Sequence, residues 1–382
     1  MIANPPQRVL ITGATGLIGG RLCEVLALAG SMVPRAFVHS TASAARITRF
    51  PLDFALGDLC SRTSVDRAMD GCDAVIHLAR GDKRVMEQGL ENVLQAASAR
   101  GVSRFVHMSS VAVYGNSPPP ECISEEAPAK RTDLEYGNVK LEQEQRVLRH
   151  AEKSGLPVVI LRPPNVYGPF AAFTSDLVNK IRNGRMAILQ GGQNPCNLVY
   201  VDNLIEAIIL ALWRSEAVGK VFFVTDNRAP TWQECLSAHA ALLGVSLIDI
   251  SSADLITPPR TRVFRDSVRA LPRVLLSGEL RAVLRQIPVV RSIENVLYAG
   301  FQSINAERQQ KIRQRINGPR EISKIGLPGP RQFLRDNIFA AQARTVAHSN
   351  EKARRLLGYT APVSFEEGMQ LTEAWLRYSR VV

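Results

Sequence analysis

The sequence lacks any hydrophobic run that could cross a membrane. The longest such runs in its 382 residues, residues 207–213 among them, fall far short of the ~18 apolar residues that span a bilayer. A strand-like segment at residues 8–12 leaves no room for a secretory signal before it. We therefore expect a cytoplasmic protein with no integral membrane segment.

The sequence also lacks paired cysteines, repeats and low-complexity segments. The six cysteines, at positions 23, 60, 72, 122, 196 and 235, include no Cys-x-x-Cys pair. This scatter argues against a disulfide framework and against a zinc site, and it predicts reduced thiols without a bound metal. A hydrophobic share of 46% with 21% charged residues is that of an ordinary globular chain. The length suggests about two domains.

Acidic residues are scarce in one segment only. The formal net charge of the chain is +12, with 47 Lys and Arg against 35 Asp and Glu. Residues 1–254 are electrically balanced, whereas residues 255–345 hold 17 basic and 6 acidic side chains. The excess positive charge therefore belongs to one segment and not to the whole protein.

Short apolar runs alternate with longer amphipathic stretches as far as residue 162. The runs typical of buried strands are residues 9–11, 36–38, 74–78, 105–108 and 158–161. This alternation predicts an α/β fold in which helices cover both faces of a parallel sheet. Ligands of such folds bind at the carboxyl ends of the strands.

The pattern changes after residue 162. Proline and glycine pairs interrupt residues 163–254, and a further strand is predicted at 221–224. Thr231 and Glu234 have the spacing of a helix capping box. Two more helices are predicted at 351–357 and from about residue 364. We interpret this part of the chain as a smaller lobe built from excursions of the sheet.

A glycine-rich turn, TGATGLIG at residues 12–19, follows the first strand and opens the first helix. Gly13 permits a tight turn, and Gly16 lets backbone N–H groups approach a pyrophosphate. Gly19 allows the helix to pack on the strand, and the helix N-terminus attracts the phosphates. With a strand before it and a helix after it, the motif predicts a bound dinucleotide.

No acidic residue follows the second strand. Enzymes strict for NAD usually carry Asp or Glu about 20 residues after the glycine turn, where it holds the ribose 2′-OH. His39 stands there instead, which removes repulsion against a 2′-phosphate that Arg35 or Arg46 could approach. The preferred cofactor is therefore NADP(H) over NAD(H). Asp58, after the third strand, is either a ligand of the adenine amine or a turn residue.

Three residues predict acid–base catalysis. Tyr136 and Lys140 are four residues apart at the start of a long predicted helix, so both side chains lie on one face. A neighbouring ammonium favours the phenolate, which lets Tyr136 exchange a proton with a substrate hydroxyl. Ser110 follows the strand at 105–108 and could hold the substrate oxygen.

Together these motifs resemble those of the extended short-chain dehydrogenases/reductases of the NAD-dependent epimerase/dehydratase family. Further matching segments are residues 57–59, 77–79, 109–115, 162–169, 199–204 and 352–375, so the resemblance covers about residues 8–250 and 346–378. It implies a Rossmann-type, doubly wound parallel sheet at 1–165, to which some later segments return. It also implies a substrate-binding lobe at 166–382 that includes a basic helical insert at 255–345.

The resemblance implies a role for each site residue. Tyr136 would be the acid and base, Lys140 its activator and a ligand of the nicotinamide ribose, and Ser110 a hydrogen-bond partner of the substrate. The residues expected to bind NAD(P) are Gly13, Thr15, Gly16, Leu17, Ile18, Gly19, His39, Asp58, Leu59, Leu78, Ala79, Lys140 and Pro163. Those expected to bind the substrate are Ser110, Val111, Tyr136 and Asn165.

Departures from the family pattern narrow the reaction. Related 4,6-dehydratases carry an Asp-Glu pair directly after the catalytic hydroxyl residue, whereas this chain has Val111 and Ala112, so dehydration is disfavoured. Several nucleotide-sugar epimerases carry an arginine where this chain has Cys196. Residues 197–203 also resemble 3β-hydroxysteroid dehydrogenase-like members, which act on apolar alcohols. Within them, Asp202 is expected to be a helix N-cap.

Within the basic segment, apolar residues recur at helical spacing over 280–287 and 293–304. Such helices could contact an anionic membrane surface peripherally through residues 262–320. We favour the simpler interpretation, in which the apolar stripes pack on the small lobe and the charges face water. Nucleic acid is not expected, because no reading motif accompanies the charge.

We therefore expect an NAD(P)-dependent oxidoreductase or epimerase that acts at a secondary hydroxyl or ketone of a small molecule. A nucleotide sugar is the preferred substrate, and a 3β-hydroxysteroid dehydrogenase-like or ketoreductase activity on a hydrophobic alcohol is the alternative. A non-catalytic NAD(P)-sensing protein is a third interpretation, against which the intact Ser110, Tyr136 and Lys140 argue. The resemblance is also compatible with a homodimer.

Overall fold

The computed structural model describes residues 6–250 and 337–382, nearly all of which belong to one compact unit made of residues 1–182, 186–251 and 335–382. A second unit, residues 183–185 and 252–334, falls almost entirely outside the described residues. The predicted basic insert is therefore described only from residue 337 onward, and the predicted surface at 262–320 lies outside the described part.

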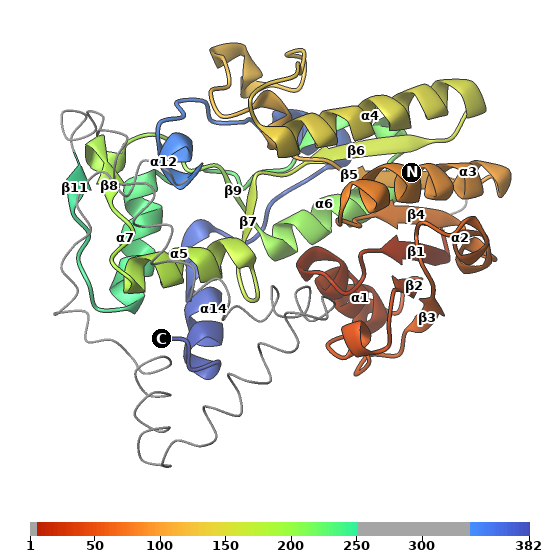
Figure 1. Cartoon of the computed structure of the whole chain (residues 1–382), viewed down its shortest axis with the longest axis horizontal. Helices are drawn as coiled ribbons and strands as arrows, with labels where there is room; N and C mark the ends of the chain where they lie inside the picture. Colours follow the sequence, from red (N-terminus) through yellow and green to blue (C-terminus); the bar gives the residue numbers. More distant parts are fainter. Residues whose placement is uncertain (1–5, 251–336) are drawn as a thin grey trace, which may run out of the picture. The chain divides into compact units, whose positions relative to one another are not determined.

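A seven-stranded parallel sheet is the centre of the first unit (Figure 1). Its order is β10-β6-β5-β4-β1-β2-β3, which confirms the doubly wound sheet. The strands are β1 (Arg8–Thr12), β2 (Val33–Val38), β3 (Asp53–Leu56), β4 (Ala74–His77), β5 (Arg104–Met108), β6 (Val158–Arg162) and β10 (Val221–Phe223). The five predicted apolar runs are all strands of this sheet, and the late strand completes it beside β6.

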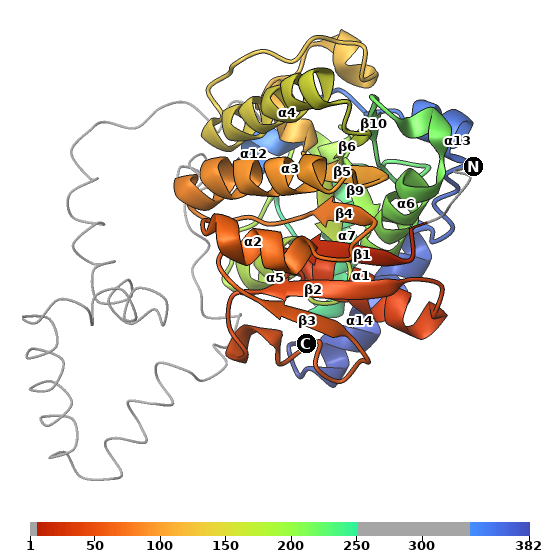
Figure 2. The ribbon, with the colours of Figure 1, turned by 90° about the vertical axis from the view of Figure 1, so that its right-hand side faces the viewer.

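Alternate strand residues face two different helical layers, as the period of two in a strand requires. Leu10, Val75 and Phe105 face one layer, and Val9, Ile11 and Val106 are among those that face the other. The first layer is α2 (Arg62–Met69), α3 (Leu90–Ala99) and α4 (Glu135–Ser154). The second is α1 (Leu17–Ala29), α6 (Val201–Trp213) and α13 (Glu351–Leu357). Figure 2 shows the two layers on opposite sides of the strands.

The remaining described elements lie beyond the carboxyl ends of the sheet strands. They are β7 (Asn165–Tyr167), α5 (Ala172–Arg182), β8 (Ile188–Leu189), β9 (Leu198–Tyr200), α7 (Trp232–Leu242), β11 (Asp249–Ile250), α12 (Asn337–Gln342) and α14 (Phe365–Tyr378). The short 3₁₀ or π turns are η1 (Ala42–Ala44), η2 (Val85–Gly89), η3 (Val111–Tyr114), η4 (Pro120–Ile123), η5 (Gln190–Gly192) and η6 (Ser215–Ala217). The predicted capping box of Thr231 and Glu234 is confirmed at the start of α7.

The prediction for Asp202 was wrong. Tyr200 is the N-cap of α6, because the helix begins directly where β9 ends. Asp202 lies inside the first turn, where a carboxylate still favours the helix dipole. There it accepts a hydrogen bond of 2.7 Å from the Arg21 Nε of α1, so that it joins two helices.

All six cysteines are unpaired and buried, as their scatter predicted. Within residues 6–250 and 337–382, no helix is both long and apolar enough to cross a membrane.

Candidate active site

The glycine turn connects β1 to α1 and lies against the end of β4. Gly13 has a φ of +68°, and a Cβ there would lie 2.8 Å from the backbone carbonyl of Leu78. A Cβ at Gly19 would lie 2.3 Å from the carbonyl oxygen of Gly13. A side chain at Gly13 would therefore push the turn away from β4, and a side chain at Gly19 would push α1 away from the turn.

The N-terminus of α1 presents backbone N–H groups that no side chain caps within residues 6–250 and 337–382. Gly16 is the N-cap and has no side chain to satisfy the first N–H groups, and the first turn holds no acidic residue. These N–H groups, which belong to the turn that includes Leu17, Ile18 and Gly19, suit a pyrophosphate. Thr15 precedes the N-cap. The residues present therefore fit a dinucleotide.

The other predicted cofactor residues follow strands of the same sheet. Leu78 and Ala79 come directly after β4, and the Ala79 N–H donates to the Thr12 hydroxyl at 3.4 Å. His39 follows β2 and is exposed, and Pro163 follows β6 and is buried. Because all strands are parallel, these positions share one edge.

Asp58 and Leu59 follow β3 at that edge. Asp58 is exposed, and its Oδ1 accepts a hydrogen bond of 2.8 Å from the Cys60 N–H. The turn interpretation of Asp58 is thus satisfied through this carboxylate oxygen. The Leu59 carbonyl accepts a hydrogen bond of 2.9 Å from Asn92, which fixes this loop on α3.

The two arginines that were considered for a 2′-phosphate lie in different places. Arg35 points to the opposite end of β2, where it binds Asp53 at 2.7 Å and the Ala68 carbonyl at 3.1 Å. The prediction that it could approach the phosphate was therefore wrong. Arg46 lies at the glycine turn, since its Nη2 donates to the Gly16 carbonyl at 3.1 Å.

Ser110 and Tyr136 come from separate elements that pack tightly together. Ser110 follows β5 and caps η3, where its hydroxyl oxygen accepts a hydrogen bond of 3.1 Å from Ala112 N–H. Tyr136 lies in the first turn of α4. A Cβ at the adjacent Gly137 would lie 2.0 Å from the Ala112 carbonyl oxygen, so glycine allows α4 to approach the Ser110 loop.

Lys140 is buried one turn along α4. Its Nζ donates to the Met108 carbonyl at 2.9 Å and to Gln143 Oε1 at 3.1 Å. Burial and, second to it, the charge of Arg80 lower the pKa of Lys140 to about 8, although the nearby Glu144 carboxylate acts in the opposite direction. Within residues 6–250 and 337–382, Lys140 makes no hydrogen bond to Tyr136.

The Tyr136 hydroxyl forms no hydrogen bond within the described ranges, 6–250 and 337–382. Burial raises the pKa of Tyr136, and the positive charge of Arg80 acts in the opposite direction. The Arg80 guanidinium carbon lies 4.8 Å from the centre of the Tyr136 ring. The sequence analysis missed this residue, although an arginine directly after the His77-Leu78-Ala79 segment was a visible signal.

A buried network of charged side chains holds the residues next to Ser110 against α4 and β6. Glu144 accepts a hydrogen bond from the Ser109 hydroxyl and two from Arg162, at 2.8 and 2.6 Å. Arg162 also donates to the Tyr114 hydroxyl at 2.7 Å. The network joins α4 to the ends of β5 and β6. Its only sequence signal was Glu144 at four residues after Lys140, which places both on one helix face.

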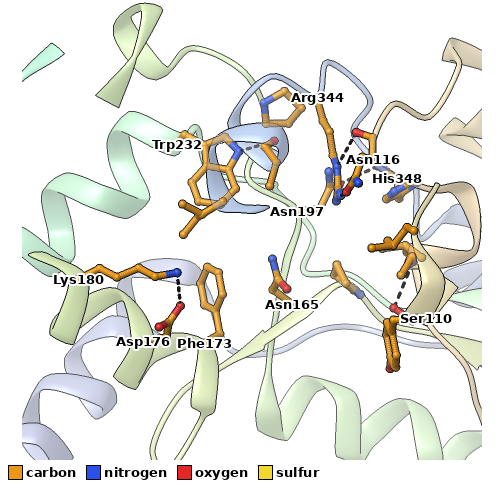
Figure 3. A pocket seen from close by; sticks show the side chains of 18 residues that line it. Ser110, Asn116, Asn165, Phe173, Asp176, Lys180, Asn197, Trp232, Arg344 and His348 are labelled. Atoms are coloured by element: carbon orange, nitrogen blue, oxygen red, sulfur yellow. Dashed lines mark hydrogen bonds and ion pairs between the residues drawn. The ribbon is translucent and has the colours of Figure 1, made fainter. Parts of the chain in front are cut away.

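A cavity of about 390 Å³ opens beside Ser110 and Tyr136 (Figure 3). Its polar lining includes the predicted Asn165 together with Asn116, Asn197, Arg344 and His348. The other residues around it are Val111, Ala112, Leu134, Pro164, Phe173, Asp176, Lys180, Pro195, Trp232, Ile338 and Ala341. The predicted substrate residues therefore share one cavity, whose outer lining the sequence analysis did not anticipate.

Arg344 is the cation that reaches this cavity from the C-terminal part of the chain. Its Nε and Nη2 donate to the backbone and side-chain oxygens of Asn116 at 3.0 and 2.9 Å. Its Nη1 has no hydrogen-bond partner within residues 6–250 and 337–382. Asp176 and Lys180 form an ion pair of 2.6 Å on the opposite wall (Figure 3).

His348 and Asn197 complete the wall near Arg344. The His348 ring binds the Cys122 carbonyl at 2.8 Å, and burial lowers its pKa to about 4, so the ring is neutral at physiological pH. Asn197 binds the Val346 carbonyl and the His348 N–H. Cys196, beside it, is fully buried and does not line the cavity.

The sequence model of the NAD dependent epimerase/dehydratase family matches residues 9–224, which is more than half of the chain. A ketoreductase of Stigmatella aurantiaca that acts on a farnesylated dihydroquinoline oxide is 32% identical over 58% of this chain and 69% of its own length. The UDP-glucose 4-epimerase of Vibrio cholerae is 28% identical over 62% of this chain and 76% of its own length.

Solved structures share the fold. The epimerase Mth375 of Methanothermobacter thermautotrophicus superposes with a TM-score of 0.66 at 20% identity and covers 99% of this chain and 94% of its own. This likeness supports the architecture and says nothing of the substrate.

Proposed function

The chain belongs to the NAD dependent epimerase/dehydratase family, and from this premise we propose that it interconverts a secondary hydroxyl and a ketone with Tyr136, Ser110 and Lys140. The observation that carries the proposal is the Tyr136 hydroxyl, which borders the cavity beside Ser110 and has no hydrogen-bond partner within residues 6–250 and 337–382. The Tyr136 side chain is only partly buried, so this hydroxyl is available to a ligand that enters the cavity. A sensor would not need it.

Each residue has a distinct task in this mechanism. Tyr136 gives its proton to the substrate oxygen in reduction and takes it back in oxidation. Ser110 donates a hydrogen bond to the same oxygen and stabilises its developing charge. Lys140 holds a positive charge behind the pair through its bonds to Met108 and Gln143. A nicotinamide dinucleotide held at this edge of the sheet would supply or accept the hydride.

The glycine turn and its neighbours would hold the cofactor. The α1 N-terminus would bind the pyrophosphate, and Leu78, Ala79 and Pro163 border the same sheet edge. We propose NADP(H) as the preferred form, because exposed His39 presents no carboxylate and Arg46 lies on the turn at 3.1 Å from the Gly16 carbonyl. A positive charge there would attract a 2′-phosphate.

A nucleotide sugar is our proposed substrate, epimerised by returning the hydride to the opposite face of a transient ketone. Phe173 and Trp232 border the cavity with ring centres 6.5 Å apart and offer aromatic faces to a nucleobase. Arg344 has Nη1 left for a phosphate oxygen, and Asn165 adds an amide. The UDP-glucose 4-epimerase of Vibrio cholerae is a relative with such a substrate.

One observation favours a hydrophobic ketone instead. Cys196, at the position where several epimerases carry arginine, is buried and outside the cavity. Leu134, Phe173 and Ile338 give the cavity apolar walls that an apolar alcohol would cover. The 32% identical ketoreductase of Stigmatella aurantiaca is a relative of this kind.

We do not propose dehydration. Val111 and Ala112 line the cavity directly after Ser110 and carry no carboxylate. Elimination of water requires a group that removes a proton next to the carbonyl and one that protonates the departing hydroxyl.

The purified full-length chain can be denatured and its released small molecules identified by mass spectrometry. We expect a retained nicotinamide dinucleotide, because an epimerase keeps its cofactor through a complete cycle. Parallel assays would supply UDP-glucose or a hydrophobic ketone with NADPH and NADP⁺. Turnover of the ketone with net consumption of NADPH would show that the chain is a reductase and not an epimerase. Failure to bind any nicotinamide dinucleotide would refute the proposed function altogether.

A further inference from the structure

Arg80 is an exposed cation placed on the face of Tyr136. It directly follows Ala79, in the loop between β4 and η2, and its guanidinium carbon lies 4.8 Å from the centre of the phenol ring. Within residues 6–250 and 337–382, its guanidinium forms no hydrogen bond and no ion pair. Its charge is therefore not neutralised by a described carboxylate.

Lys140, the expected activator of Tyr136, is placed differently. Its Nζ is engaged by the Met108 carbonyl at 2.9 Å and by Gln143 Oε1 at 3.1 Å. Burial and, to a lesser extent, the charge of Arg80 itself lower the pKa of Lys140 to about 8, so this ammonium loses its proton in the mildly alkaline range. A guanidinium keeps its charge throughout that range.

We propose that Arg80 is the permanent positive charge that stabilises the Tyr136 phenolate. The inference rests on the proposed role of Tyr136 as acid and base. Arg80 acts through Tyr136 and is therefore a positioning residue. A cation on a ring face is attracted by a neutral phenol, and it is attracted more strongly by a phenolate, whose ring carries a full negative charge. The difference between the two favours ionisation.

Besides Arg80, the charged and titratable groups around Tyr136 come from three places. Lys140 lies on its own helix, and Arg344 and His348 line the same cavity from the C-terminal part of the chain. The ion pair of Asp176 and Lys180 lines it from α5. His348 is neutral above its pKa of about 4. Arg80 is the charge that acts against burial on the Tyr136 pKa.

Spectroscopic titration of the full-length chain tests the proposal without a substrate. The absorbance change of phenolate formation is measured against pH in the parent and in Tyr136→Phe, and their difference reports Tyr136 alone. The same difference is measured in chains that carry Arg80→Gln or Arg80→Lys, each with and without Tyr136→Phe. Chains that carry Arg84→Gln, again with and without Tyr136→Phe, are the matched control. Arg84 lies on the same loop but binds Gln88 at 3.3 Å.

We expect Arg80→Gln to raise the pKa of Tyr136 by about one unit, the size of an ion interaction at this distance in a partly solvated site. Arg80→Lys keeps the positive charge, so the pKa of Tyr136 should stay close to that of the parent. Arg84→Gln should leave the pKa of Tyr136 unchanged. An unchanged Tyr136 titration in Arg80→Gln would overturn the proposal, and loss of turnover alone would then assign Arg80 to ligand binding. If the proposed chemistry is wrong but the inference holds, the pKa shift persists without turnover of any substrate.

Discussion

At the residue scale, Tyr136 combines partial burial with a hydroxyl that has no partner within residues 6–250 and 337–382. We expect Tyr136→Phe to lower kcat by about 10²- to 10⁴-fold, the usual contribution of a positioned acid or base. Cofactor affinity should change little, because the ring remains. Steady-state assays that follow the nicotinamide absorbance measure kcat, and fluorescence titration with NADPH measures cofactor affinity. Tyr378→Phe, at a side chain 90% exposed, is the control that should behave as the parent.

Asp226 makes the stability of the chain depend on pH. Burial raises the pKa of Asp226 to about 6, against hydrogen bonds from Asn203 and from the Tyr200 N–H. Because the folded state binds this proton more tightly than the unfolded state, the free energy of unfolding falls as pH rises from about 4 to about 6. The loss from this group is about 3 kcal/mol. Urea unfolding at about pH 4 and about pH 8 measures most of this loss.

Asp226→Asn should remove that dependence, because an amide has no proton to lose. Its stability relative to the parent should therefore be greater at the higher pH than at the lower one. A constant difference between the two proteins would contradict the assignment.

Arg46 is the residue on which cofactor choice is expected to depend. We expect Arg46→Ala to weaken NADPH binding about tenfold, since one charge-assisted bond to a phosphate contributes about 1.5 kcal/mol or more. NADH, which has no 2′-phosphate, should bind as before. Fluorescence titration with NADPH and with NADH measures both affinities. Tighter binding of NADH than of NADPH by the parent chain would contradict the preference for NADP(H).

At the scale of elements, α4 carries Tyr136 and Lys140 on the same face as Glu144. The Arg162–Glu144 pair is almost wholly buried, with side chains 7% and 3% exposed. We expect Glu144→Gln to destabilise the fold by about 3–5 kcal/mol, because Arg162 is then left charged and unpaired. Urea unfolding measures the loss.

Two comparisons make this test specific. Glu144→Gln combined with Arg162→Met should recover part of the stability, because no unpaired buried charge remains. Glu142→Gln on the exposed side of α4 should change stability by less than about 0.5 kcal/mol. A double variant as unstable as Glu144→Gln would show that the charge pair is not what stabilises this junction.

At the scale of the whole molecule, the excess positive charge and the proposed catalytic residues lie in different parts of the sequence. Residues 1–254, which hold Ser110, Tyr136 and Lys140, are electrically balanced, and the excess belongs to residues 255–345. On the interpretation that the apolar stripes of this segment pack against protein, we expect the full chain not to float with phosphatidylserine vesicles. Flotation that low salt strengthens, and that deletion of 262–320 abolishes, would instead support peripheral membrane contact.

The strands and the glycine turn could be predicted because their signals are local. Buried parallel strands are apolar throughout, and the turn needs glycine for reasons of backbone geometry at Gly13 and Gly19. The helix start at Asp202 was misjudged, because the N-cap depended on where β9 ended. Arg35 was misjudged because only its register on β2 shows which end of the strand it faces.

By itself the sequence determined the family and the parallel sheet, and it predicted Ser110, Tyr136 and Lys140 as the catalytic residues, since these depend on spacing along one chain. Only the tertiary structure decided which charges meet. Arg80 on the Tyr136 ring and Arg344 against Asn116 join positions 56 and 228 residues apart. Such contacts carry no local pattern, because they arise only when the sheet brings the ends of separate strands to one edge.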